Sequence, residues 1–157
     1  MPTRPVRAFL FLAALTAGAM LSVASAAQAA PPAVEVQAEN AWIPQPPPGA
    51  QVAAAYLTLR NNGRMAAVLV GVNSPVASNA MVHRTMVMNG ESMMMPIERL
   101  TVPPGQTVTL KPDAMHVMLD GLHGPPLQVG QRVPLVLHFA GGAEIRVSAL
   151  VRPLGSQ

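Results

Sequence analysis

Residues 133–151, VPLVLHF-AGGA-EIRVSALV, decide the fold class of this chain. Two β-rich segments with largely alternating character flank Gly141-Gly142, a pair typical of a turn. Similar short segments are residues 34–36, 53–60, 67–72, 81–88, 96–102, 107–110 and 116–119. The turns between them include Asn61-Asn62-Gly63, Asn89-Gly90, Pro103-Pro104-Gly105 and Gly124-Pro125-Pro126. Because no segment of helical length and period follows residue 30, we predict an all-β, antiparallel sandwich or barrel in a single domain.

The composition of the 157-residue chain excludes several classes of protein. Its residues are 50% hydrophobic and 11% charged, which supplies enough apolar surface for one packed core, with Trp42 and Phe139 expected in it. There is no cysteine, so disulfides, thiolate zinc sites, blue-copper centres and thiol nucleophiles are excluded. No Ser/His/Asp or paired-carboxylate arrangement has a recognisable spacing, so we do not expect an enzyme.

The N-terminus has the pattern of a secretory signal peptide. Arg4 and Arg7 precede an uncharged apolar run over residues 8–23, and two Ala-x-Ala signals end at Ala26 and Ala29. A membrane anchor is the alternative, but 16 apolar residues are short for a span. We therefore predict a signal peptide over residues 1–29, a mature domain over residues 30–157, a periplasmic location and no stable membrane insertion after cleavage.

Cleavage also removes most of the basic excess. Without Arg4 and Arg7, eight basic residues face seven acidic ones, and no Lys/Arg cluster remains. We expect no nucleic-acid partner, because phosphate backbones are bound by such clusters.

The mature chain concentrates its methionines in one window. It has nine, and eight of them lie between Met81 and Met118, together with His83 and His116. Methionines that only fill gaps in a core should be spread over all strands. The clustering favours a thioether metal site, although core packing remains an alternative from this pattern alone.

Strand geometry and ligand chemistry narrow the metal. His116 and Met118 lie on the same side of a strand, since residues two apart share a face. His83 comes from another strand, and one or two members of the triplet Met93-Met94-Met95 could join it. Neutral thioethers suit Cu(I), whereas zinc prefers thiolate, imidazole or carboxylate, and calcium needs a carboxylate cluster. We predict a shallow Cu(I) site near the surface, because a buried charge is costly.

The spacing of four residues resembles the motif of a known family. His83, Met94, His116 and Met118 fit H-x10-M-x21-H-x-M, which is similar to the motif of the periplasmic Cu(A) chaperone family, PCu(A)C. The resemblance covers most of residues 34–152. It implies a cupredoxin-like β-sandwich that binds Cu(I) through these two histidines and two methionines. It also implies delivery of copper to the Cu(A) centre of cytochrome c oxidase subunit II, directly or with Sco-type proteins, and we expect a monomer.

One departure from the family pattern concerns partner choice. The family tends to have an arginine shortly after the tryptophan, whereas this chain has Trp42-Ile43-Pro44-Gln45. Two other functions are alternatives to copper delivery. A copper redox protein is disfavoured because its site would use a cysteine thiolate. Copper buffering without a dedicated acceptor needs the same ligands, so the sequence does not separate it from delivery.

The remaining candidates have more ordinary interpretations. His123 is expected to be a solvated loop residue, with an auxiliary Cu(II) ligand as the alternative. Met81 shares a strand face with His83 and could line the site. Met86 and Met88 are expected in the core, and Met93, Met95 and Met115 could form an apolar rim for a partner.

Overall fold

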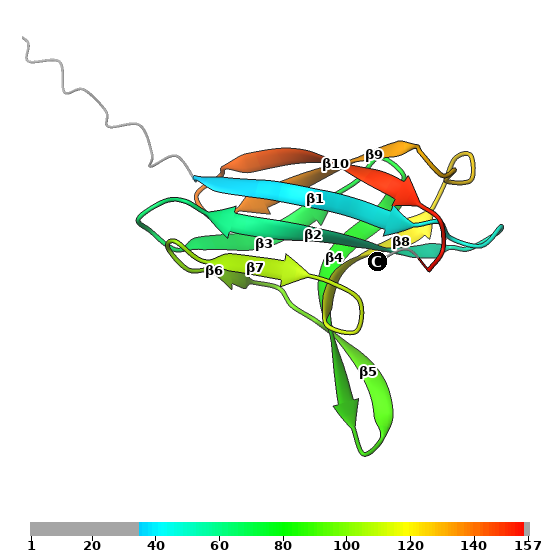
Figure 1. The fold of residues 1–157 in the computed structure, drawn as a ribbon, viewed down its shortest axis with the longest axis horizontal. Coiled ribbons are helices and arrows are strands. Elements are labelled where there is room, and N and C mark those ends of the chain that lie inside the picture. Colours follow the sequence, from blue (N-terminus) through cyan, green and yellow to red (C-terminus); the bar gives the residue numbers. More distant parts are fainter. Residues whose placement is uncertain (1–34, 156–157) are drawn as a thin grey trace, which may run out of the picture.

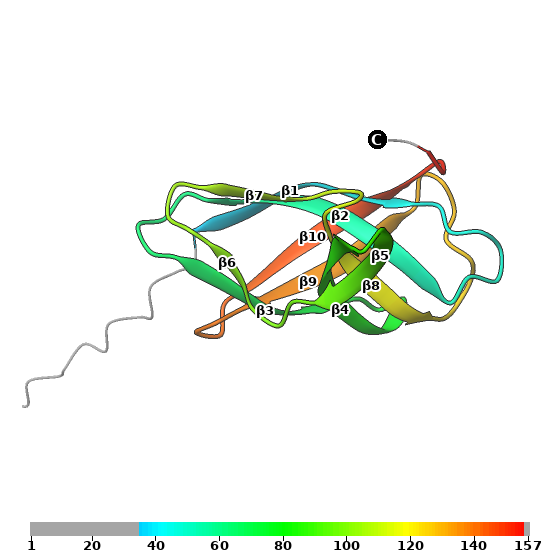
Figure 2. The same cartoon turned by 90° about the horizontal axis from the view of Figure 1, so that it is seen from below.

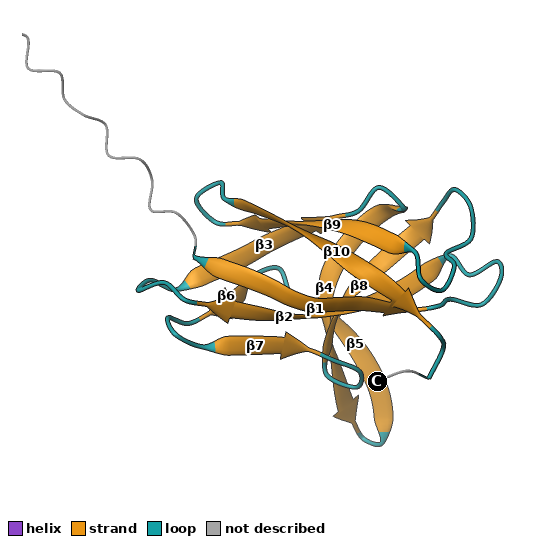
Figure 3. Ribbon diagram, turned by 45° about the horizontal axis from the view of Figure 1, so that its top comes forward, coloured by secondary structure: helices purple, strands orange, loops and turns teal. Residues whose placement is uncertain are grey.

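The computed structural model describes residues 35–155, and between them the chain forms ten β-strands (Figures 1 and 3). The strands are β1 (Val36–Pro44), β2 (Val52–Asn61), β3 (Ala67–Asn73), β4 (Ala77–Met88), β5 (Glu91–Pro96), β6 (Leu100–Val102), β7 (Thr107–Leu110), β8 (Met115–Leu122), β9 (Arg132–Phe139) and β10 (Glu144–Arg152). The predicted all-β, cupredoxin-like fold is confirmed. The signal-peptide prediction for residues 1–29 lies outside the described residues.

The ten strands form two layers that share β2. The hydrogen-bonded order is β5-β4-β8-β2-β1-β10-β9-β3-β6. Residues 52–55 of β2 pair with β8, and residues 57–60 pair with β7. In Figure 2, β1, β2 and β7 run along one side of the molecule, and β3 and β6 lie along the other. The shared strand connects the layer that carries β4, β5 and β8 to the rest of the sandwich.

One strand pair departs from the antiparallel prediction. β1 and β10 pair in parallel, with Trp42 opposite Leu150 and Pro44 opposite Arg152. Hairpins impose antiparallel pairing on strands that follow each other, but eight strands separate β1 from β10. Nothing in the local pattern of either strand encodes this pairing, so the sheet is mixed.

The structure adds one strand to the predicted set and changes the bounds of others. The added strand is β5, since only Pro96 of the segment expected over residues 96–102 lies in β5, and residues 100–102 form β6. Beyond Pro96, the last residue of β5, the Ile97 amide still donates to the Val82 carbonyl at 2.8 Å, and the chain then crosses so that β6 pairs with β3. Of the segment predicted at residues 34–36, residue 34 lies outside the described residues and Val36 begins a longer strand, β1, which reaches Pro44 at the start of the proline-rich loop.

The core lies between the two layers and is mostly aliphatic. The fully buried side chains include Ile43, Leu59, Leu119, Leu135 and Leu137. Phe139 is buried in this cluster, as predicted. Trp42 is also buried, but it lies outside the core cluster and packs against Tyr56, with their ring centroids 4.7 Å apart.

The β4–β5 hairpin extends beyond the sandwich. It turns at Asn89-Gly90, whose φ angles of 54° and 83° are those of a two-residue type I′ turn. Figure 1 shows the hairpin projecting away from the other strands, and every residue of β5 is exposed. The second half of β4 therefore has no core to cover.

Within residues 35–155, no helix has the length and apolar character needed to cross a membrane.

Asn61, the last residue of β2, stabilises the end of this strand through hydrogen bonds of its side chain. Its buried side-chain amide donates to the Met65 and Val102 carbonyls at 2.7 and 2.9 Å, and its oxygen accepts from the Gly63 amide at 2.9 Å. We predict that Asn61→Ala lowers the free energy of unfolding by about 2 kcal/mol, because buried polar groups lose their partners. Urea denaturation measures this loss.

Asn62→Ala is the matched control, because Asn62 is exposed and its side chain only accepts from Arg60. We expect a change below about 0.5 kcal/mol for this variant. Equal losses in the two variants would contradict the role given to Asn61.

Candidate metal site

The two candidate histidines face each other across β4 and β8. His83 is the register partner of His116, and their ring centroids are 6.0 Å apart. Their chain neighbours Val82 and Val117 are buried in the core. Because successive side chains of a strand alternate between faces, both imidazoles lie on the outer face of this layer.

The two candidate methionines belong to the same face. Met118 lies two residues after His116 on β8. Met94 is opposite Thr85, which follows His83 by two residues on β4. Directly paired residues in a sheet share a face, as do residues two apart on one strand. The register thus brings His83, Met94, His116 and Met118 onto one outer surface of β4, β5 and β8, which we call the site face.

The four side chains differ in exposure. His116 is 5% exposed, whereas Met94 is 59% exposed on the projecting hairpin. His83 and Met118 are half-buried. The site face is therefore closed around His116 and open at Met94, which agrees with the expectation of a shallow site.

A buried nitrogen without a partner supports metal binding on this face. Nδ1 of His83 is buried and makes no hydrogen bond. Buried polar atoms are nearly always paired, so an unpaired nitrogen requires an explanation. Two imidazoles and two thioethers are neutral, polarisable donors, and a soft monovalent metal ion fits this donor set.

Burial keeps His116 in its ligating form. Desolvation lowers the pKa of His116 below 6.5, and the neighbouring His83 lowers it further. Tyr56 lies edge-on to His116, with ring centroids 6.4 Å apart, and helps to cover it. Burial and the carboxylate of Asp113 raise the pKa of Tyr56, so its hydroxyl stays protonated.

Apart from Met81, the remaining methionines of the window lie on the face of β4, β5 and β8 opposite to the site face. Met86 pairs with Met93, and Arg84 pairs with both Met95 and Met115. The Arg84 guanidinium lies 3.8 Å from the Met115 sulfur, and Met115 packs partly against the core.

The prediction that Met86 and Met88 belong to the core is wrong. They are 40% and 51% exposed, because β4 runs past the end of the sandwich. Met93 and Met95 are also exposed, at 49% and 48%, so the predicted apolar rim has exposed members. We call Met86, Met88, Met93 and Met95 the reverse face of the hairpin.

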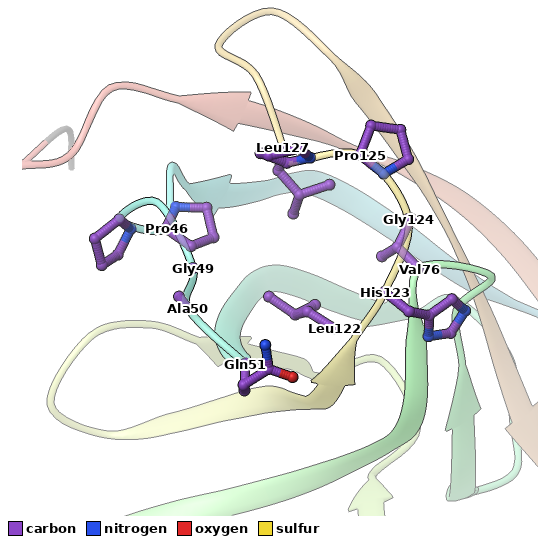
Figure 4. A pocket seen from close by; sticks show the side chains of 12 residues that line it. Pro46, Gly49, Ala50, Gln51, Val76, Leu122, His123, Gly124, Pro125 and Leu127 are labelled. Atoms are coloured by element: carbon purple, nitrogen blue, oxygen red, sulfur yellow. The ribbon is translucent and has the colours of Figure 1, made fainter.

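His123 lies apart from the site face. It follows β8, seven residues and about 23 Å of extended strand after His116. It lines a cavity of about 130 Å³ at the proline-rich end of the sandwich (Figure 4). Its Nδ1 is 3.1 Å from the Gly121 carbonyl oxygen. Among residues 35–155, no three His, Cys, Asp or Glu side chains are grouped to hold a metal ion. The auxiliary Cu(II) ligand remains an untested prediction.

Sequence reasoning did not identify two contacts of aromatic rings, of which the first reaches a candidate ligand. Tyr56 covers His116, and Arg152 places its guanidinium 5.2 Å from the centroid of the Trp42 ring. Arg152 thus brings a cation to the tryptophan from β10, although no arginine follows Trp42 in β1. Each contact joins residues from strands that are far apart in sequence, so the sequence could not predict either contact.

The chain is an all-β sandwich with imidazoles and thioethers gathered on one outer face. Comparison with known proteins identifies its family. A family model described as "LpqE-like: Putative lipoprotein LpqE-like" matches residues 36–151. "Putative lipoprotein Lxx21020" of Leifsonia xyli subsp. xyli is 34% identical over 142 residues, which cover 90% of this chain and 84% of the relative. The chain belongs to the LpqE-like family, and its predicted relationship to the PCu(A)C family is confirmed.

Solved structures support the same assignment. The solution structure of CuI-DR1885 from Deinococcus radiodurans is 35% identical with a TM-score of 0.58, and the match covers 78% of this chain and 80% of that one. The copper-bound PCuAC domain from PmoF2 aligns with a TM-score of 0.64 at 24% identity, over 77% of this chain and 96% of that one. The second likeness shows the shared fold.

The lowered pKa of His116 predicts a pH dependence of stability in the metal-free protein. Below pH 6.5 the unfolded chain binds a proton at His116 that the folded chain does not bind. The free energy of unfolding should therefore fall as the pH falls from 6.5 through the lower pKa of the folded state, and His116 should contribute no slope above this window. Urea denaturation between pH 5 and pH 7.5 (about the range in which histidine titrates) measures the slope.

We expect His116→Asn to have a shallower slope than the wild type over this window. His123→Asn is the matched control for the loss of one imidazole. Identical slopes for wild type and His116→Asn would contradict the effect of burial on His116.

Proposed function

We propose that this protein is a periplasmic Cu(I) metallochaperone that delivers copper to the Cu(A) centre of cytochrome c oxidase subunit II, directly or with Sco-type proteins. The observation that carries the proposal is the pairing of His83 with His116 beside Met118 and Met94 on one outer face. The similar protein DR1885 from Deinococcus radiodurans has been solved with Cu(I). The lipoprotein names of the family and of the relative support export.

The donor chemistry favours the reduced ion. Thioether sulfur stabilises Cu(I), and imidazole completes a four-donor set without adding charge. His83 and His116 would hold the ion from the rigid sandwich, since both lie on strands that pack against the core. Met118 would bind from β8, and Met94 would close the site from the hairpin.

The same chemistry supports transfer. Four neutral ligands leave the bound ion with its single positive charge, which the acceptor's cysteine thiolates can neutralise. Each new copper–thiolate bond replaces a copper–imidazole or copper–thioether bond, and the thiol proton goes to solvent or to a released imidazole. Copper stays Cu(I) throughout, so no oxidant or reductant is needed. The exposure of Met94 supports an approach of the acceptor from the hairpin side.

Loss of either thioether should weaken Cu(I) binding. We predict that Met94→Ala and Met118→Ala each lower the Cu(I) affinity, with the larger loss, at least about tenfold (1.4 kcal/mol), for Met118→Ala. Competition with a chromophoric Cu(I) chelator measures the affinity. Met86→Ala removes an exposed thioether of the reverse face and should bind Cu(I) as the wild type does. Unchanged affinity in both Met94→Ala and Met118→Ala would refute the proposed site.

A transfer experiment separates delivery from buffering. The Cu(I)-loaded protein is mixed with the reduced soluble domain of oxidase subunit II, and the copper content of each is measured after separation. Delivery predicts movement of copper to the acceptor without any free chelatable copper. If copper stays with the loaded protein, and added Sco-type protein does not change this, the delivery proposal is wrong and buffering is favoured.

A further inference from the structure

Met81 is a third thioether on the site face, outside the four-residue motif. It lies two residues before His83 on β4, and it is the register partner of Met118 on β8. Directly opposite residues of an antiparallel pair have Cβ atoms about 4.5–5.5 Å apart. Two flexible methionine side chains at that separation can reach the same ion.

Met81 and Met94 are held very differently. Met94 belongs to β5, an edge strand that pairs only with β4 and whose six residues are all exposed. A two-stranded hairpin has little stability of its own. Met81 lies on the part of β4 that pairs with β8, and its neighbour Val82 is buried in the core. The hairpin can therefore carry Met94 away from the sandwich, whereas Met81 stays beside Met118.

Met81 also has space in which to turn. It lines a groove between β3 and β4 together with Val70 and Ile97, and its side chain is half-buried there. Its sulfur has no hydrogen bond that would have to break before it binds an ion. A turn toward Met118 thus breaks no hydrogen bond and gives up only part of the apolar contact that Met81 makes in this groove.

We propose that Met81 is a replacement ligand that binds Cu(I) when Met94 leaves the site. This inference rests on the proposed function and names a step in the release of the ion. The bond from copper to the Met94 sulfur breaks as the bond to the Met81 sulfur forms. One neutral thioether replaces another, so neither an electron nor a proton moves. The ion keeps two imidazoles and two thioethers while the hairpin opens its side of the site to an acceptor.

Sulfur counting by X-ray absorption tests the exchange directly. Cu(I)-loaded wild type, Met94→Ala, Met81→Ala and Met94→Ala/Met81→Ala are compared, and their Cu(I) affinities are measured by chelator competition. We expect two sulfur ligands in the wild type and in both single variants, and one in the double variant. We expect the double variant to bind Cu(I) at least about tenfold more weakly than Met94→Ala, because the two thioethers are coupled.

The matched control is Met94→Ala/Met86→Ala, which removes a second thioether from the reverse face. It should keep two sulfur ligands and the affinity of Met94→Ala. If Met94→Ala retains only one sulfur, or if the Met94→Ala/Met81→Ala variant still has two, the role of Met81 is overturned while the proposed function stands. If the wild type has no sulfur ligand to Cu(I), the proposed function itself fails.

Discussion

The register between β4 and β8 is the constraint on which the site depends. It places His83 opposite His116 and Met81 opposite Met118, while Val82 and Val117 face the core between the layers. A slip of β4 by one residue against β8 would turn His83 inward, away from His116, and Val82 outward. The alternation of side chains along β4 and β8 therefore determines both the burial of the valines and the positions of the candidate ligands. Because exposing a buried valine is unfavourable, the register that aligns the ligands is stabilised.

The same alternation divides the methionines between two faces with different chemical neighbours. On the site face, thioethers stand beside imidazoles and beside a histidine nitrogen that has no other partner. On the reverse face they stand beside the Arg84 guanidinium, a cation that disfavours a second metal ion nearby. Clustering in sequence thus does not mean one cluster in space. The sandwich contributes the firmly held donors and the projecting hairpin contributes the exposed one.

The sequence predicted local geometry well and long-range geometry poorly. The two-residue spacing of His116 and Met118 was enough to put them on one face, because alternation is a local property of a strand. The choice of Met94 from its triplet came from family resemblance, and the register now gives it a structural reason, since Met94 is diagonal to His83 while Met93 and Met95 point the other way. Met86 and Met88 were misassigned because alternation does not reveal where a strand leaves the sandwich. The parallel pairing of β1 with β10 was equally beyond reach, since it depends on the whole topology.

Methionine-methyl NMR during a Cu(I) titration shows which face holds the metal ion, because every methionine of both faces gives a separate resonance. We predict that the methyl resonances of Met118 and Met94 shift at stoichiometric Cu(I), together with the ring resonances of His83 and His116. The methyls of Met86, Met88, Met93 and Met95 should stay unchanged. A first response from these four, or no response from Met118, would contradict the claim that the outer face of β4, β5 and β8 holds the metal.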